Sequence, residues 1–249
     1  MQRATDASEK QFLRQEKEKI PSFQQDSSVD LLPRLDDKRI TAMCDNQAPV
    51  IPYDKPDSVI FSQPVEGYCG DASINTVLRS FVGVKLQPIP SVVRPMSLQV
   101  LKSRLETEVL ESLKPNAPFR AARHFHVDPR EMSFKRFVEL LSLANKPGHR
   151  VLVNFLRSAG FAERPPFLPP SRALALMGGH WSPVASVGRL PHSSDANRTG
   201  HDADDDGIVA LVLDVNDSYG PFVISAYRLY LTCATMDGKT YRGLIILDV

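Results

Sequence analysis

The chain contains the stretch Gln63-Pro-Val-Glu-Gly-Tyr-Cys69-Gly-Asp-Ala-Ser73-Ile-Asn-Thr-Val-Leu78, in which a glycine-containing turn meets the start of an amphipathic segment. The turn delivers Cys69 to the N-terminus of a predicted helix. Backbone N–H groups without helical partners and the positive end of the helix dipole stabilise a thiolate over a thiol at such a position. The stretch therefore predicts a nucleophile, which needs a base and an oxyanion donor from elsewhere in the chain.

Three segments in the first part of the chain have apolar residues at helical spacing. They are residues 73–84, 98–113 and 133–143. The last of them starts after Ser133, which we expect to cap its N-terminus because a serine hydroxyl accepts a hydrogen bond from the first helical turn. From residue 150 onward the pattern changes to short runs rich in β-branched residues, flanked by Gly, Pro or Asp. These predicted strands are residues 150–156, 180–187, 207–215 and 242–249.

Helices followed by strands favour an α+β fold with an antiparallel sheet, since alternating βαβ units are lacking. Residues 1–45 differ in composition from the rest: a charged run, Glu9 to Lys19, precedes a stretch rich in Ser, Gln and Asp. We predict a flexible N-terminal extension there, with an interaction helix as the alternative. Residues 46–249 are then expected to form one catalytic domain.

Composition excludes several classes of protein. The 249 residues are 42% hydrophobic and carry a formal net charge of +1, which gives no reason to expect nucleic acid or an anionic membrane as partner. Three cysteines are too few and too scattered for a disulfide framework or a structural zinc site. The N-terminus has no apolar signal region, and no apolar run is long enough to span a membrane. We therefore expect a cytoplasmic protein with reduced thiols.

Two further residues suit Cys69 as partners. His180 follows two glycines in Met177-Gly-Gly-His-Trp-Ser-Pro, at the start of a predicted strand, and Asp214 ends the apolar run Ile-Val-Ala-Leu-Val-Leu. A cysteine on a helix, with histidine and aspartate on strands, is the arrangement of papain-type catalysis. Gln63 is then the candidate oxyanion donor, together with the Cys69 backbone N–H. The simpler alternatives are a buried thiol, a structural histidine, and an aspartate or glutamine that only bonds a turn.

Several segments, in the same order, resemble the phytochelatin synthases and their shorter bacterial-type relatives, within the papain-like cysteine peptidase superfamily. The similar segments are Phe61 to Leu78, Asn154-Phe-Leu-Arg157, Gly179-His-Trp-Ser-Pro183, Leu211-Val-Leu-Asp-Val215 and Met236 to Gly243. The resemblance covers residues 57–249. It implies a papain-like fold, in which a helical first half packs its nucleophile helix on the antiparallel sheet.

The resemblance also implies a reaction. Cys69 would attack the peptide bond between the cysteine and glycine of glutathione, releasing glycine and leaving γ-glutamylcysteinyl on the enzyme. Gln63 would be the oxyanion donor, His180 the base and Asp214 its orienter. Transfer of the acyl group to a second glutathione gives phytochelatin, and transfer to water gives γ-glutamylcysteine.

For the substrate, the resemblance implies that Arg242 and Asp237 hold the γ-glutamyl end, and that Gly179 belongs to the binding site. Arg157 is expected either to bind a substrate carboxylate or to form an ordinary ion pair. No cofactor is required; Cd²⁺ or Zn²⁺ would enter as a thiolate complex of the substrate. Glutathione is the expected partner, and a homodimer is possible within this superfamily.

The chain departs from the family pattern in places that bear on the acceptor. Where the synthases carry a basic and aromatic stretch, this chain has Val215-Asn-Asp-Ser-Tyr-Gly-Pro, without a cation. The cysteine-bearing segment before the third helix is here residues 119–126, without cysteine, and its His124 and His126 would share one face of a strand. We therefore expect hydrolysis to dominate over transfer. The other functions considered are a general thiol peptidase or deamidase, and a catalytically silent papain-fold binding module.

Overall fold

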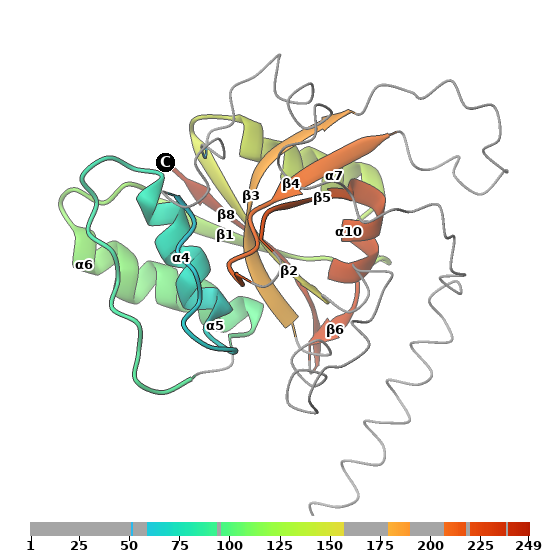
Figure 1. Ribbon diagram of the computed structural model, residues 1–249. Helices are drawn as coiled ribbons and strands as arrows, with labels where there is room; N and C mark the ends of the chain where they lie inside the picture. Colours follow the sequence, from blue (N-terminus) through green and yellow to red (C-terminus); the bar gives the residue numbers. More distant parts are fainter. Residues whose placement is uncertain are drawn as a thin grey trace, which may run out of the picture. The chain divides into compact units, whose positions relative to one another are not determined.

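The computed structural model describes residue 51 and residues 59–93, 96–156, 179–189, 207–217, 220–237 and 239–249. These residues form a six-stranded sheet with helices against both of its faces (Figure 1). Every pair of neighbouring strands is antiparallel, so the predicted mixture of helices with an antiparallel sheet is confirmed. The predicted extension 1–45 and Arg157 lie outside the described residues.

The strands follow one another across the sheet in the order β1-β8-β2-β3-β4-β5. Their bounds are β1 Ala121–His126, β2 His149–Leu156, β3 Gly179–Arg189, β4 Ile208–Val212, β5 Phe222–Ser225 and β8 Gly243–Asp248. A separate small hairpin pairs β6 (Met236–Asp237) with β7 (Thr240–Tyr241). Both faces of the central strands are buried, which explains why these strands read as continuous apolar runs rather than as alternating ones.

One face of the sheet carries the helices of the first half. Helix α4 (Cys69–Arg79) contacts β3, and α5 (Leu98–Arg104) contacts β1 and β8. A π-helical stretch η1 (Leu105–Leu110) and a last turn α6 (Glu111–Leu113) continue α5, so the predicted helix over 98–113 is confirmed as one continuous element. The sheet side chains packed on this side include Leu152, Trp181, Leu211 and Ile245.

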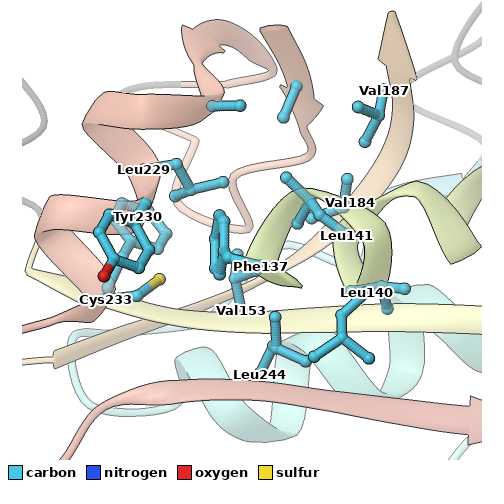
Figure 2. Close-up of a cluster of buried hydrophobic side chains, with 14 of the residues drawn as sticks. Phe137, Leu140, Leu141, Val153, Val184, Val187, Leu229, Tyr230, Cys233 and Leu244 are labelled. Carbon is cyan, nitrogen blue, oxygen red and sulfur yellow. The ribbon is translucent and has the colours of Figure 1, made fainter. Parts of the chain in front are cut away.

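The opposite face carries α7 (Phe134–Leu141), a 3-10 turn η2 (Ser142–Asn145) and α10 (Ala226–Cys233). Figure 2 shows Phe137, Leu229 and Tyr230 from these helices grouped with Val153, Val184 and Leu244 of the sheet. The Ser133 hydroxyl accepts a hydrogen bond from the Arg136 backbone N–H at 3.2 Å, so the predicted cap of this helix is confirmed.

Three elements differ from the prediction. The helix with its N-terminus predicted at Cys69 does begin there, but it ends at Arg79, short of the predicted residue 84. The strand considered for His124 and His126 is present as β1, whereas strand β5 and helix α10 in the second half were not predicted. The α10 sequence Ala-Tyr-Arg-Leu-Tyr-Leu-Thr-Cys mixes helix and strand formers, and its packing against α7 and β2 decides the outcome.

Candidate active site

The nucleophile turn needs a glycine at one point. Gly67 has a φ of +95°, and a Cβ there would overlap the side chain of Val93. The chain then enters α4 with Tyr68 as N-cap residue, whose side chain makes no capping hydrogen bond. Cys69 is a partly exposed thiol at the positive end of an 11-residue helix. This placement lowers the free energy of a thiolate relative to a thiol.

His180, near the start of β3, joins the thiol to a carboxylate. Its Nε2 lies 2.8 Å from Oδ1 of Asp214, and its ring is also hydrogen-bonded to the Cys69 thiol. Since Nε2 faces Asp214, Nδ1 is the nitrogen left for the sulfur. The same Oδ1 of Asp214 accepts the Asn216 backbone N–H at 2.8 Å, which fixes the carboxylate just beyond the end of β4. The structure thus brings Cys69, His180 and Asp214 together in one hydrogen-bonded row.

The surroundings of His180 favour its charged form. Burial alone would lower the pKa of His180, but the Asp214 charge and the hydrogen bonds from Asp214 and Cys69 outweigh burial and raise this pKa above its usual value of 6.5. The Phe155 ring and the His180 imidazole pack in a T-shaped arrangement, with 5.6 Å between their ring centroids and an interplanar angle of 90°. A raised histidine pKa beside a thiol favours transfer of the thiol proton to the imidazole.

One hydrogen bond joins α4 to β3, and a second joins β3 to the segment before α5. The Ser73 hydroxyl, in the second turn of α4, donates to the Trp181 carbonyl at 2.9 Å. The Trp181 indole N–H in turn donates to the Met96 carbonyl at 2.7 Å. Gly70 leaves room for the Met96 sulfur, which a Cβ would overlap. These contacts set the distance between Cys69 and the residue before Trp181, which is His180.

Gln63 lies in the loop that precedes the nucleophile, beside the aspartate segment. Its backbone N–H donates to the Val215 carbonyl at 2.8 Å, and the neighbouring Ser62 hydroxyl is hydrogen-bonded to Asp217. The Gln63 side-chain Oε1 is buried and has no hydrogen-bond partner. The loop is therefore tied to residues 215–217, which immediately follow Asp214.

Arg242 provides a buried cation near the nucleophile. The residue is 4% exposed, and its Nη1 donates to Oδ1 of Asn154 at 3.2 Å and lies 3.7 Å from Oδ2 of Asp237. Burial lowers the pKa of Arg242, while the charges of Asp237 and Cys69 act in the opposite direction, so the guanidinium and the thiol are within electrostatic range. Gly179 makes this arrangement possible, since a Cβ there would overlap both Arg242 Nη1 and Asn154 Oδ1.

The predicted site residues thus divide into three groups. Cys69, His180 and Asp214 are joined by hydrogen bonds, and Gln63 is tied to the segment next to Asp214. Arg242, Asp237 and Gly179 form a second cluster beside them. Arg157, predicted as a substrate contact, lies outside the described residues.

Sequence reasoning assigned no role to Asn154 and Ser73. Asn154 is 1% exposed and holds Arg242, and Ser73 links α4 to β3. A signal for Asn154 was present, because it is the one polar residue within the apolar run Val151–Leu156. Such a residue is buried with a hydrogen-bonding partner or marks a site. Ser73 gave no such signal, since serine is common near helix starts.

No metal centre emerges from the part of the chain that the structure describes: no group of three or more His, Cys, Asp or Glu side chains there could hold an ion. His124 and His126 do share one face of β1, with their rings edge to face at 5.4 Å. Within the same described part, no helix combines the length and apolar character needed to cross a membrane.

Compared with known proteins, the chain matches no protein-family model and no curated protein. The chemistry of this site therefore has to be argued from its own residues.

Proposed function

We propose that this protein is a papain-like cysteine enzyme, related to the phytochelatin synthases, that cleaves the Cys–Gly bond of glutathione through an acyl-enzyme on Cys69. The observation that carries the proposal is the buried His180, hydrogen-bonded on one side to Asp214 and on the other to the Cys69 thiol. A structural histidine would gain nothing from a partly exposed thiol at a helix N-terminus, whereas a general base needs such a neighbour.

The first half of the reaction follows from this row. His180 takes the thiol proton, and the Cys69 thiolate attacks the carbonyl carbon of the Cys–Gly peptide bond. The oxyanion that forms lies near the Cys69 backbone N–H and the Gln63 amide, which stabilise its charge. The imidazolium then gives its proton to the glycine nitrogen as the C–N bond breaks. Glycine leaves, and γ-glutamylcysteinyl remains bound to sulfur as a thioester.

The cluster around Arg242 supports a γ-glutamyl substrate. The γ-glutamyl end of glutathione carries an α-carboxylate and an α-ammonium on the same carbon. Arg242 offers a guanidinium to the carboxylate, and Asp237, about one third exposed, offers a carboxylate to the ammonium. Asn154 and Gly179 keep the guanidinium in place. An ordinary protein substrate has no such zwitterion, so this cluster favours glutathione over a general peptidase substrate.

The second half depends on the acceptor, and the charges of the loop after Asp214 favour water. Glutathione carries two carboxylates and one ammonium at neutral pH, so a second glutathione is an anion. Residues 215–217 offer it no cation, and Asp217, which is bonded to Ser62, adds a negative charge. His180 then activates a water molecule, which attacks the thioester carbon. γ-Glutamylcysteine leaves with its carboxylate, and the thiol is restored. No resident cofactor takes part, and Cd²⁺ or Zn²⁺ would enter only on the thiolate of the substrate.

The test is to incubate the purified protein with glutathione and to measure glycine, γ-glutamylcysteine and longer phytochelatin chains by mass spectrometry. We expect glycine release with γ-glutamylcysteine as the main product, and an acyl adduct on the peptide that contains Cys69 when the reaction is stopped with acid. Cys69→Ala is expected to abolish both adduct and glycine. The matched control is Cys233→Ala, since Cys233 is a buried core thiol. A reduced, folded protein that releases no glycine refutes the proposal.

A further inference from the structure

Ser182, two residues after His180 on β3, is completely buried, and its hydroxyl has no hydrogen-bond partner. Leaving a buried hydroxyl unpaired is unfavourable by about 1–3 kcal/mol, so buried serines normally donate to a neighbour. Ser182 has no role so far in the hydrogen-bonded row of Cys69, His180 and Asp214. Its position in the sheet shows which polar group lies within its reach.

The strand register places Ser182 opposite Asp214. Val184 of β3 faces Val212 of β4, and the Leu213 backbone N–H donates to the Pro183 carbonyl at 2.9 Å, which continues the same antiparallel ladder by one residue. The next pair along is therefore Ser182 and Asp214. Since Pro183 and Leu213 form the hydrogen-bonded pair, Ser182 and Asp214 form the closer, non-hydrogen-bonded kind, in which Cβ atoms are about 4.5–5.5 Å apart.

Both side chains also lie on the same face of the sheet as His180. His180 and Ser182 are two residues apart on β3, so their side chains lie on the same face. Asp214 comes two residues after Val212 of β4, so its side chain lies on the face of Val212. On the other side of Ser182, β2 presents Val153, which has no polar side chain. Asp214 is therefore the polar side chain directly across from the Ser182 hydroxyl, while His180 reaches the same carboxylate from the diagonal position at 2.8 Å.

We infer that Ser182 is a positioning residue for the Asp214–His180 pair. A rotation about its Cα–Cβ bond turns the hydroxyl so that it donates to the Asp214 carboxylate. This bond holds the carboxylate from the position directly across the strand pair, next to the His180 contact, and shares part of its negative charge. The inference deepens the proposed function and rests on it, because it assigns to Ser182 a role in orienting the base.

The consequence for pH has a definite sign. A donor to Asp214 withdraws some of its charge from His180, so removing this donor strengthens the attraction for the imidazolium and raises the pKa of His180 further. The other groups that face His180 are Asp214 and the Cys69 thiol, with the Phe155 ring against its edge. All three are unchanged in a Ser182 variant, so a shift reports the hydroxyl.

The experiment measures the rates at which iodoacetate and iodoacetamide alkylate Cys69 as a function of pH. Both reagents need the thiolate, but only the anionic iodoacetate is also attracted by the imidazolium. The ratio of the two rates therefore falls as His180 loses its proton. For Ser182→Ala we expect the pH at which the rate ratio falls to increase by about half a unit. We also expect a lower urea midpoint of unfolding, because one hydrogen bond is lost.

Three further variants make the result specific. Ser182→Thr keeps the hydroxyl and should have the same pH profile as the unaltered protein. Ser182→Cys keeps the side-chain shape but offers only a weak donor, so it should behave like Ser182→Ala. Ser186→Ala removes another buried hydroxyl of β3, opposite Leu211 and away from Asp214, and should leave the profile unchanged.

If the pH dependence of the rate ratio does not shift in Ser182→Ala, the inference is wrong. A higher urea midpoint would then show that the hydroxyl is unpaired, and a lower midpoint would show that it has only a structural role. Neither reagent requires glutathione. A protein that alkylates with the expected shift but releases no glycine therefore refutes the proposed function and supports the role of Ser182.

Discussion

At the scale of single residues, Gly179 illustrates why a glycine precedes the base. The two glycines before His180 suggest a close backbone approach, and what approaches Gly179 is a pair of side chains. The Arg242 guanidinium and the Asn154 amide occupy the space in which any other residue would place its Cβ. Arg242 is 4% exposed and has no open side toward which it could move freely. The glycine is therefore a requirement of the cluster that we propose to bind substrate.

Gly179→Ala is expected to displace Arg242 and to raise the KM for glutathione about tenfold, the loss that follows from one weakened charge-assisted hydrogen bond. The alkylation rate of Cys69 by iodoacetamide should stay nearly the same, since the row of three residues is not touched. Steady-state kinetics with glycine detection measures the first quantity. The control is Gly148→Ala, because a Cβ at Gly148 meets no neighbour. An unchanged KM in Gly179→Ala would contradict the role given to Arg242.

The raised pKa of His180 predicts a second outcome. The Asp214 carboxylate is the main cause of the increase, and burial opposes it. In Asp214→Asn burial should dominate, so the ratio of iodoacetate to iodoacetamide rates should fall at a lower pH than in the unaltered protein. For stability the sign is that of a raised pKa: the imidazolium contribution is complete below about pH 6.5 and is lost as the pH rises through the folded-state pKa. Asp128→Asn, at a buried carboxylate that pairs with the exposed Arg130 in a turn, is the control that should leave the ratio unchanged.

At the scale of elements, α4 is fastened to the sheet near both of its ends. Near its start, Ser73 donates to Trp181 of β3. Beyond its end, the Ser80 hydroxyl accepts from Nε of Arg150 at 2.9 Å, and the Arg150 guanidinium lies 4.4 Å from the Phe81 ring centroid. Burial lowers the pKa of Arg150 to about 10, which still leaves it charged at neutral pH. The helix that carries the nucleophile is thereby held along the strands that carry the base and the substrate cluster.

Ser73→Ala should lower the free energy of unfolding by about 1–3 kcal/mol, because it leaves the buried Trp181 carbonyl without this donor. The same change loosens Cys69 relative to His180, so we also expect kcat for glutathione to fall by more than KM changes. Urea unfolding and steady-state kinetics measure the two effects. Ser103→Ala, on the exposed side of α5, is the matched control and should alter neither. Equal stability of Ser73→Ala and the unaltered protein would show that the link contributes nothing.

At the scale of the whole sheet, Asp248 joins three strands at one edge of the molecule's core. From the end of β8 it accepts two hydrogen bonds from Arg123 of β1, at 2.7 and 2.6 Å, and lies 3.1 Å from Nδ1 of His149 in β2. The Arg123 and His149 contacts lower the pKa of Asp248 below its usual value. This group crosses the ladders β1–β8 and β8–β2, whose residues come from both halves of the chain.

Asp248→Asn is expected to reduce the free energy of unfolding by about 1 kcal/mol at pH 7, a modest value because the pair is partly exposed and screened by water. Since the folded-state pKa is lowered, the stabilisation is present above about pH 4 and is lost as the pH falls through the folded-state value. Urea unfolding of both proteins at pH 7 and near pH 2 should thus show a difference only at pH 7. Glu139→Gln, which breaks an exposed pair within α7, should have a smaller effect. A difference that persists at pH 2 would rule out this electrostatic origin.

The sequence alone predicted the elements whose periodicity is strong. The helix over 98–113, the capped helix after Ser133 and the central strands β2, β3 and β8 all agree with the structure to within a few residues. It suggested β1 only through the alternation of His124 and His126, since the Ala-Ala-Arg-His-Phe-His run is polar, and it missed α10, whose residues suit either state. Both are decided by neighbours distant in sequence: β1 by pairing with β8, and α10 by packing on α7 and β2.

The same division holds for the site. The residue types in the Cys69 turn, the Gly-Gly-His180 segment and the run ending at Asp214 already determined which groups are chemically suited to act together, since helix starts and strand ends place such groups at one edge. Only the tertiary structure decided that His180 reaches Cys69 and Asp214 at once, that Asn154 and Gly179 shape the position of Arg242, and that Ser182 faces Asp214. The physical reason is that local sequence sets backbone geometry within a few residues, whereas the register of β3 against β4 and the docking of α4 on β3 depend on packing over the whole sheet.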